Sequence, residues 1–223
     1  MRRIAIFFSL FLALFALKAQ TPPTLSPAVK AFVTVDSPLF ALSHVRVIDG
    51  TGAPARDDQT IIVAGGKIQA MGNADAVPVP SGAKVIELRD YTVIPGLVGM
   101  HNHIFYPAGP AHYNTLAFSA PRLYLACGVT TIRTTGSLEP FTELNLKRAI
   151  HQGRVPGPKM HVTSPYFEGP GAFTLQMHEL TGPEEARMMV EYWAEQGVDD
   201  FKVYTNITKA LSLIHISEPT RPY

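Results

Sequence analysis

Cysteine is almost absent from this sequence, in which Cys127 is the single example among 223 residues. A lone cysteine excludes any disulfide within the chain, and with it the disulfide framework that holds many small secreted domains together. It also leaves no lipid-acceptor cysteine near the N-terminus, which argues against a lipoprotein. The fold must therefore rest on its hydrophobic core.

An excess of charge of one sign is also lacking, because 19 Lys and Arg residues balance 18 Asp and Glu residues to a net charge of +1. Binding to nucleic-acid phosphates requires a basic patch, and none is visible, so no nucleic-acid partner is expected. The composition, with 46% hydrophobic and 17% charged residues, is that of an ordinary globular protein. It excludes a disordered, collagen-like or coiled-coil chain.

Long hydrophobic runs are confined to the N-terminus. After two arginines, residues 4–17 are apolar apart from one serine, and residues 18–20 offer a small residue for cleavage. This layout predicts a secretory signal peptide over residues 1–19, because the run is shorter than the about 20 apolar residues of a membrane helix. An uncleaved N-terminal anchor is the alternative. The expected location is the periplasm or the outside of the cell, and residues 20–38 are expected to form a linker.

Two regions with different patterns of apolar residues and turns follow. Residues 39–95 contain short apolar and β-branched segments between tight turns, which predicts a small β-domain. From residue 96 the pattern changes to strands that alternate with helices, which favours a parallel α/β sheet or barrel. The expected strands are 97–103, 129–133, 160–163 and 198–204. The expected helices are 111–126, broken at Pro121, then 141–151, and one that opens with a capping box of Thr181 and Glu184 and ends at Gly197.

The segment VIPGLVGMHNH, residues 93–103, carries the most chemical information. Side chains two residues apart on a strand point to the same side, so His101 and His103 can both reach one metal ion. Imidazole is a common ligand of zinc-like ions. Because such a pair also occurs among structural histidines, the spacing by itself leaves packing open as the alternative.

This segment resembles the start of the amidohydrolase superfamily, together with the DGTG turn at 49–52 and the hairpin IIVAGGKIQAMG at 61–72. The closer likeness is to its imidazolonepropionase-like and Xaa-Pro dipeptidase-like members. GVTTIRTTG and DDFKVY resemble the second and fourth barrel strands, in the family's order and spacing. The resemblance implies a TIM-type (β/α)8 barrel preceded by a small β-sandwich domain, with a metal site at the C-terminal ends of the barrel strands. Residues 96–210 would supply the first four βα units, less than half of the about 250 residues of a complete barrel.

The resemblance also implies roles for individual residues. His101 and His103 would bind the more buried of two divalent metal ions, with zinc as the first choice. Lys202, carboxylated by CO2, would bridge both ions. An unmodified lysine is a cation at neutral pH and cannot ligate a metal, whereas its carbamate is an anion with two oxygens. An ordinary ion-paired lysine is the alternative for Lys202. The general-base Asp is expected downstream, so no catalytic residue is assigned within this chain.

Four further residues are expected to contact substrate, with packing or ion pairing as the alternative. Glu168 and His178 follow the third strand, and Arg133 and Tyr204 lie at strand ends, where barrel enzymes build their pockets. Gly99 departs from the resemblance, because many family members carry Asp at this position. This departure weakens the subgroup assignment more than the metal site.

For the complete protein, the resemblance predicts hydrolysis of a C–N bond in a small-molecule amide, cyclic amide or dipeptide. A lactonase or other ester hydrolase on the same site is one alternative, and a non-catalytic barrel that binds a small ligand is another. A homo-oligomer is left open, and no membrane span is expected after signal cleavage.

The last residues depart from this pattern. Residues 211–221 resemble a translated transposase sequencing adapter, so residues 211–223 are expected to be an artefact and His215 is not a candidate ligand. The chain by itself is expected to be inactive and poorly soluble, because half a barrel leaves two strand edges open.

Overall fold

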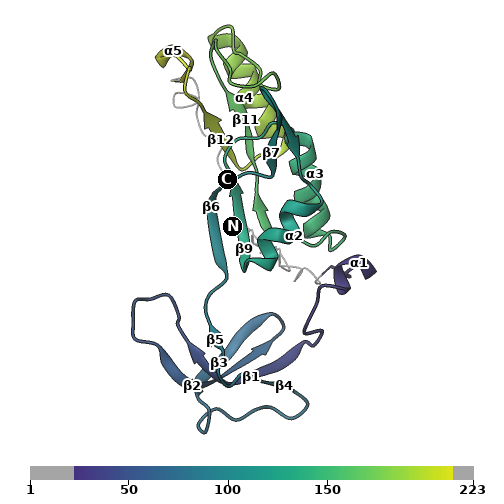
Figure 1. The fold of residues 1–223 in the computed structure, drawn as a ribbon, viewed down its shortest axis with the longest axis vertical. Helices are drawn as coiled ribbons and strands as arrows, with labels where there is room; N and C mark the ends of the chain where they lie inside the picture. The colour runs from purple at the N-terminus through teal and green to yellow at the C-terminus, as the bar shows by residue number, and fades with distance from the viewer. Residues whose placement is uncertain (1–22, 213–223) are drawn as a thin grey trace, which may run out of the picture.

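The computed structural model describes residues 23–212 in two parts, a β-domain and an α/β part above it in Figure 1. The expected signal peptide lies outside the described residues, as do positions 213–223 of the expected artefact. Among the residues that are described, no helix has the length and apolarity needed to cross a membrane.

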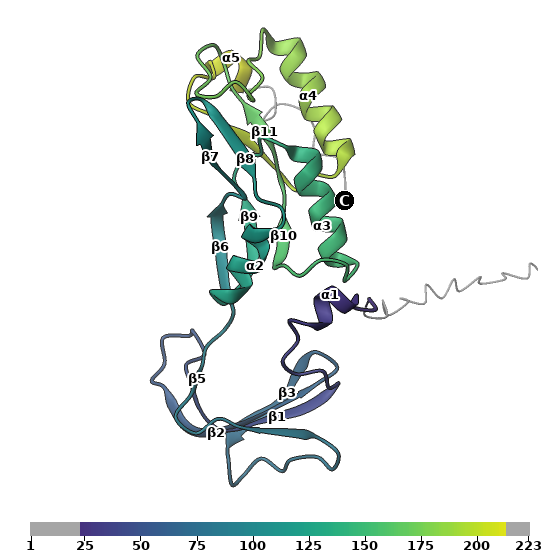
Figure 2. The ribbon, with the colours of Figure 1, turned by 45° about the vertical axis from the view of Figure 1, so that its right-hand side comes forward.

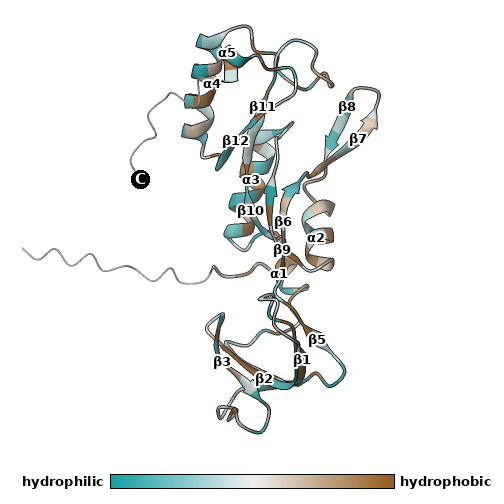
Figure 3. Cartoon of the chain, turned by 90° about the vertical axis from the view of Figure 1, so that its left-hand side faces the viewer, coloured by the Kyte–Doolittle hydropathy of each residue, from teal (hydrophilic) through white to brown (hydrophobic). Residues whose placement is uncertain are grey.

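The β-domain is a single twisted sheet in the order β3-β2-β1-β4, with β5 also paired to β1. Its strands are β1 (Leu39–Val47), β2 (Arg56–Ala64), β3 (Lys67–Asn73), β4 (Lys84–Glu87) and β5 (Thr92–Val93). Alternate residues of β1 are buried, and Val45 and Val47 pack with Ile61 of β2 as its core. Figure 3 shows the hydrophobic colour along β1. The second layer of the expected sandwich is not among the described residues.

The α/β part begins at β6 (Leu97–Asn102) and alternates strands with helices, as predicted. Its further elements are β7 (Phe105–Gly109), β8 (His112–Thr115), α2 (Ser119–Ala126), β9 (Val129–Thr134), α3 (Pro140–His151), β10 (Lys159–His161), β11 (Thr163–Phe167), α4 (Pro183–Gln196), β12 (Asp200–Val203) and α5 (Lys209–Ser212). Parallel pairing joins β6 to β9, β9 to β10 and β11 to β12, and a parallel bridge links Ser137 to Pro165. Four successive parallel strands with intervening helices confirm the expected first half of a barrel.

The core of this part lies between the strands and the helices. Ile132, Met160 and Phe167 contribute from the strands, while Leu144 and Trp193 contribute from α3 and α4. Figure 2 shows α3 and α4 on one side of the strands and β6 away from them. On β6 the side chains of Leu97, Val98 and Met100 are 49%, 58% and 64% exposed. Because β6 is the last strand of its sheet, one of its edges is unpaired, as expected of half a barrel.

Three local predictions were wrong. The helix expected from residue 111 begins only at Ser119, because residues 112–115 pair with β7 as a hairpin. Pro121 lies in the first turn of α2, where its missing N–H costs no helical hydrogen bond, so it does not break the helix. The N-cap of α4 is Gly182 and not Thr181, and the backbone N and Oγ1 of Thr181 donate to Glu185 at 2.7 and 2.8 Å, so both the cap and the carboxylate lie one residue later than predicted.

The expected linker contains a short helix, α1 (Pro27–Lys30), whose N-cap is Ser26. The backbone N of Ser26 donates to the carbonyl of Gly153 at 2.9 Å, and its Oγ donates to the carbonyl of Arg154 at 3.1 Å. These contacts dock the linker on the end of α3 before it enters the β-domain.

Candidate functional site

The two histidines lie together at the C-terminal end of β6. Their ring centroids are 5.4 Å apart with the rings nearly perpendicular, so both side chains occupy the same side, as the spacing predicted. The backbone at this strand end is held from two directions. Tyr124 Oη on α2 donates to the carbonyl of His103 at 2.8 Å, and the backbone N of Thr135 donates to the carbonyl of Asn102 at 3.1 Å.

The environment of His103 favours the neutral imidazole. Its Nδ1 is buried and has no hydrogen-bond partner among the described residues. Burial lowers the pKa of His103, and the positive charges of His101 and Lys202 lower this pKa further. Neutral imidazole is the form that ligates metals, so His103 is kept in its ligating state. The effect of Lys202 on this pKa also shows that the fold brings the lysine within electrostatic range of the histidines.

Lys202 lies on β12 and is half-buried. Its Nζ lies 5.4 Å from the ring centroid of Tyr204. The neighbouring carboxylates are engaged elsewhere, because Asp199 pairs with Lys147 at 2.6 Å and Asp200 pairs with Arg133 at 2.7 Å. Within residues 23–212 no carboxylate forms an ion pair with Lys202, so the ion-paired alternative has no partner here.

The described part of the chain supplies an incomplete set of donors. No three His, Cys, Asp or Glu side chains within residues 23–212 gather where they could hold a metal ion. The available donors are the imidazoles of His101 and His103 and the amine of Lys202, which becomes a ligand only as a carbamate. This set fits part of the binuclear site that the resemblance implies.

Gly99 has a local structural explanation. A Cβ atom built at Gly99 would overlap the side chain of Asn102, which folds back over it. Many members of the family that this sequence resembles carry aspartate at this position. An aspartate here would require the side chain of Asn102 to move. Gly99 and Asn102 form a matched pair at the end of β6.

The four predicted substrate contacts have different surroundings. Tyr204 lies beside Lys202, whereas Arg133 is occupied by its ion pair with Asp200. Glu168 is fully buried, and its Oε1 accepts from the backbone N of Asn206 at 2.6 Å, which ties together the loops after β11 and β12. His178 is exposed and lies 2.6 Å from Glu185 at the start of α4. The structure thus places Tyr204 beside Lys202, while the other three have structural partners.

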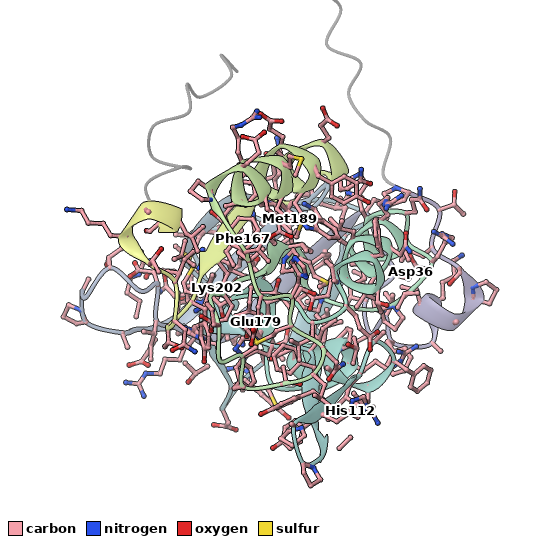
Figure 4. All side chains as sticks on the ribbon, turned by 90° about the horizontal axis from the view of Figure 1, so that it is seen from above. Asp36, His112, Phe167, Glu179, Met189 and Lys202 are labelled. Atoms are coloured by element: carbon pink, nitrogen blue, oxygen red, sulfur yellow. The ribbon has the colours of Figure 1, made fainter. Side chains whose placement is uncertain are left out.

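Sequence reasoning missed a set of aromatic residues at this end of the strands, which we call the aromatic wall. It comprises Phe105, Tyr113, Phe173, Tyr166 and Tyr204. The wall begins at His103, whose ring centroid lies 4.6 Å from that of Phe105, and ends at Tyr204 beside Lys202. Figure 4 shows Lys202 among many side chains near the middle of the view from above, with His112 at the periphery. No spacing rule could have found the wall, because its residues come from the β7–β8 hairpin, from β11 and the loop after it, and from the end of β12.

A buried carboxyl group also lies in this part of the fold. Glu143 on α3 is fully buried, and neither of its oxygens has a hydrogen-bond partner among the described residues. Burial raises the pKa of Glu143 to about 7, against the opposing effect of the nearby Ser137 and Thr134 hydroxyls, and the charge of Glu139 acts in the same direction as burial.

Replacing Glu143 by Gln is expected to remove a pH dependence of stability. The folded carboxyl has a pKa of about 7 against an ordinary value of 4.5, so the folded state binds the extra proton and loses stability as pH rises through this interval. The loss amounts to about 3 kcal/mol once both states are ionised. In the complete protein, thermal unfolding should show Glu143→Gln gaining stability over the parent at pH 8 and not at pH 5. The exposed Glu191→Gln is the control, and an equal offset at both pH values would contradict the prediction.

Comparison with known proteins gives a consistent set of relatives. The chain is 30% identical over 183 residues to an allantoinase from Streptomyces avermitilis, covering 80% of this chain and 39% of that protein. It is 32% identical over 114 residues to a dihydroorotase from Anaeromyxobacter dehalogenans, covering 48% of this chain and 25% of that protein. The structure of a prolidase candidate from Bifidobacterium longum aligns with a TM-score of 0.64 at 26% identity, over 76% of this chain and 41% of that one. No family model matches the chain.

The matched segments of these proteins are partial. The chain spans 39% and 25% of the two curated relatives and 41% of the solved structure. The chain therefore corresponds to less than half of the length of each of these proteins.

Proposed function

Because the chain belongs to the amidohydrolase superfamily, we propose that the complete protein is a metal-dependent hydrolase of C–N bonds in amides, cyclic amides or dipeptides. This agrees with the names allantoinase, dihydroorotase and prolidase among the matched proteins. The observation that carries the proposal is the His101–His103 pair at the end of β6, within electrostatic range of a strand lysine that lacks a carboxylate partner in residues 23–212.

The residues present fit one part of a binuclear centre. His101 and His103 would hold one divalent ion, zinc as first choice, and Lys202 would bridge to a second ion after carboxylation by CO2. When bound, such ions lower the pKa of a water molecule and polarise the substrate carbonyl. The chain contributes a neutral His103, kept so by burial, and a strand end fixed by Tyr124. The general base and the remaining ligands are expected downstream of residue 210.

We also propose that the protein acts in the periplasm or outside the cell. The two N-terminal arginines and the apolar run at residues 4–17 support export. The small-molecule substrate would then be an exported or external compound.

Metal analysis combined with substrate assays tests the proposed activity. The complete reading frame is recovered from the source locus, and the purified protein is analysed by plasma mass spectrometry and assayed on dipeptides, a cyclic amide and a lactone. We expect two equivalents of divalent metal and turnover of an amide substrate. Turnover of the lactone only would favour the ester hydrolase, and a protein without bound metal would contradict both hydrolases in favour of a ligand-binding barrel.

A further inference from the structure

The aromatic wall forms an unbroken set of ring contacts between the two halves of the candidate metal site. From Phe105 the centroid distances are 5.4 Å to Tyr113, then 5.7 Å to Phe173 and 5.5 Å to Tyr204. Tyr166 contacts both of the last two rings, at 5.9 Å from Phe173 and 4.9 Å from Tyr204. A group bound at the metal site between His103 and Lys202 would therefore lie next to an aromatic surface.

Hydrogen bonds brace this wall before any ligand binds. The side chain of Gln176 pairs with the backbone of Tyr113 twice, accepting from its N at 2.7 Å and donating to its carbonyl at 2.9 Å. Thr174 Oγ1 and the backbone N of Leu175 both donate to the carbonyl of Ala111, at 2.8 and 3.1 Å. The loop after β11 is thus joined to the β7–β8 hairpin as one unit, which reduces the entropy lost on binding.

Within the wall, Tyr166 is tightly packed, whereas Phe173 is open to solvent. Tyr166 is only 5% exposed, and its ring lies against Gly136, where a Cβ atom would overlap it. Burial raises the pKa of Tyr166, which keeps its phenol neutral. Phe173 is 40% exposed, so its ring offers apolar surface to an incoming group.

We propose that the aromatic wall selects substrates that carry an aromatic or branched apolar group beside the scissile C–N bond. The inference deepens the proposed function and rests on it. Aromatic side chains gain energy from apolar and aromatic partners. The five members of the wall include no ionised side chain, so a charged substituent there would lose hydration without gaining an ion-pair partner from them.

The test compares two substrates in the complete protein. Phe173→Ala is assayed on dipeptides that carry Phe on either side of the scissile bond, and on Ala-Ala. We expect kcat/KM for a Phe-containing dipeptide to fall about tenfold, as for other losses of hydrophobic pocket contact, with Ala-Ala changed less than about twofold. Tyr106→Ala is the matched control, because Tyr106 lies on the same hairpin, is 69% exposed and is not part of the wall. Equal losses on both substrates, or no loss on either, would overturn the inference.

Gln176 is inferred to act as a positioning residue for the wall. In Gln176→Ala the two hydrogen bonds to Tyr113 are lost, and we expect KM for the Phe-containing dipeptide to rise severalfold with little change in kcat. A fall in kcat on both substrates would indicate a general structural role and would contradict the assignment.

A binding measurement separates failure of this inference from failure of the proposed function. Calorimetry compares N-acetylphenylalanine with N-acetylglycine, on the metal-loaded and the metal-free protein. If the parent binds N-acetylphenylalanine preferentially and Phe173→Ala loses this preference, the proposed selectivity of the wall is supported even if the protein hydrolyses nothing. Equal binding of both compounds to the parent overturns the proposed selectivity of the wall, while the metal and turnover results that test the proposed function are unaffected.

Discussion

Replacing His101 or His103 by Ala is expected to lower the metal content of the complete protein and to reduce kcat/KM by more than about 100-fold. Loss of a group that merely orients a ligand already costs 10- to 100-fold in metal affinity or activity, so loss of a ligand should cost more. The His103 variant is expected to be the more severe, because its ring is more buried and its Nδ1 lacks any other partner among the described residues. Plasma mass spectrometry and steady-state kinetics measure the two effects.

His112→Ala is the control for both histidine variants. His112 is an exposed residue of β8, and Figure 4 shows it well apart from Lys202. It should retain the metal content and activity of the parent. Variants of His101 and His103 that kept their full metal content would show that the pair is a packing feature, which was the alternative on spacing alone.

Lys202→Arg is expected to be nearly as damaging, although it preserves the positive charge. A guanidinium stays protonated and cannot become a carbamate, so the bridging anion would be missing. We expect more than about 100-fold loss of kcat/KM and the loss of at least one metal ion. In the parent, reconstitution of metal-free protein with zinc should proceed faster with added bicarbonate, and Lys202→Arg should show no such response.

Lys67→Arg serves as the matched substitution, because Lys67 is an exposed residue of β3 in the β-domain. It should behave as the parent in metal content, activity and bicarbonate response. A Lys202→Arg variant that bound two equivalents of metal would remove the carbamate from the proposed site, while leaving the histidine pair to be judged by its own variants.

The sequence by itself determined the features that depend on local spacing. The H-x-H pair, the alternation of strands with helices after residue 96, and the end of α4 at Gly197, with φ of +90°, all follow from a few neighbouring residues. The resemblance to the amidohydrolase superfamily rests on such short blocks too, because each block keeps its own pattern of glycine, histidine and β-branched residues. Lys202 could be singled out only through that resemblance.

The tertiary structure alone decided which distant segments meet. The hairpin at residues 105–115 replaced part of an expected helix, because its strands pair with each other and its turn is held by Thr174 and Leu175. The joining of Tyr113 to Phe173 in the aromatic wall and the structural role of Glu168 likewise arise from contacts between distant segments, as in the 38-residue separation of Glu168 and Asn206. Periodicity records which face of a strand or helix is apolar, but the partner of that face depends on how the strands assemble. For this reason the pairing of the two histidines on one side of β6 could be predicted from the sequence, whereas the surface beside it could not.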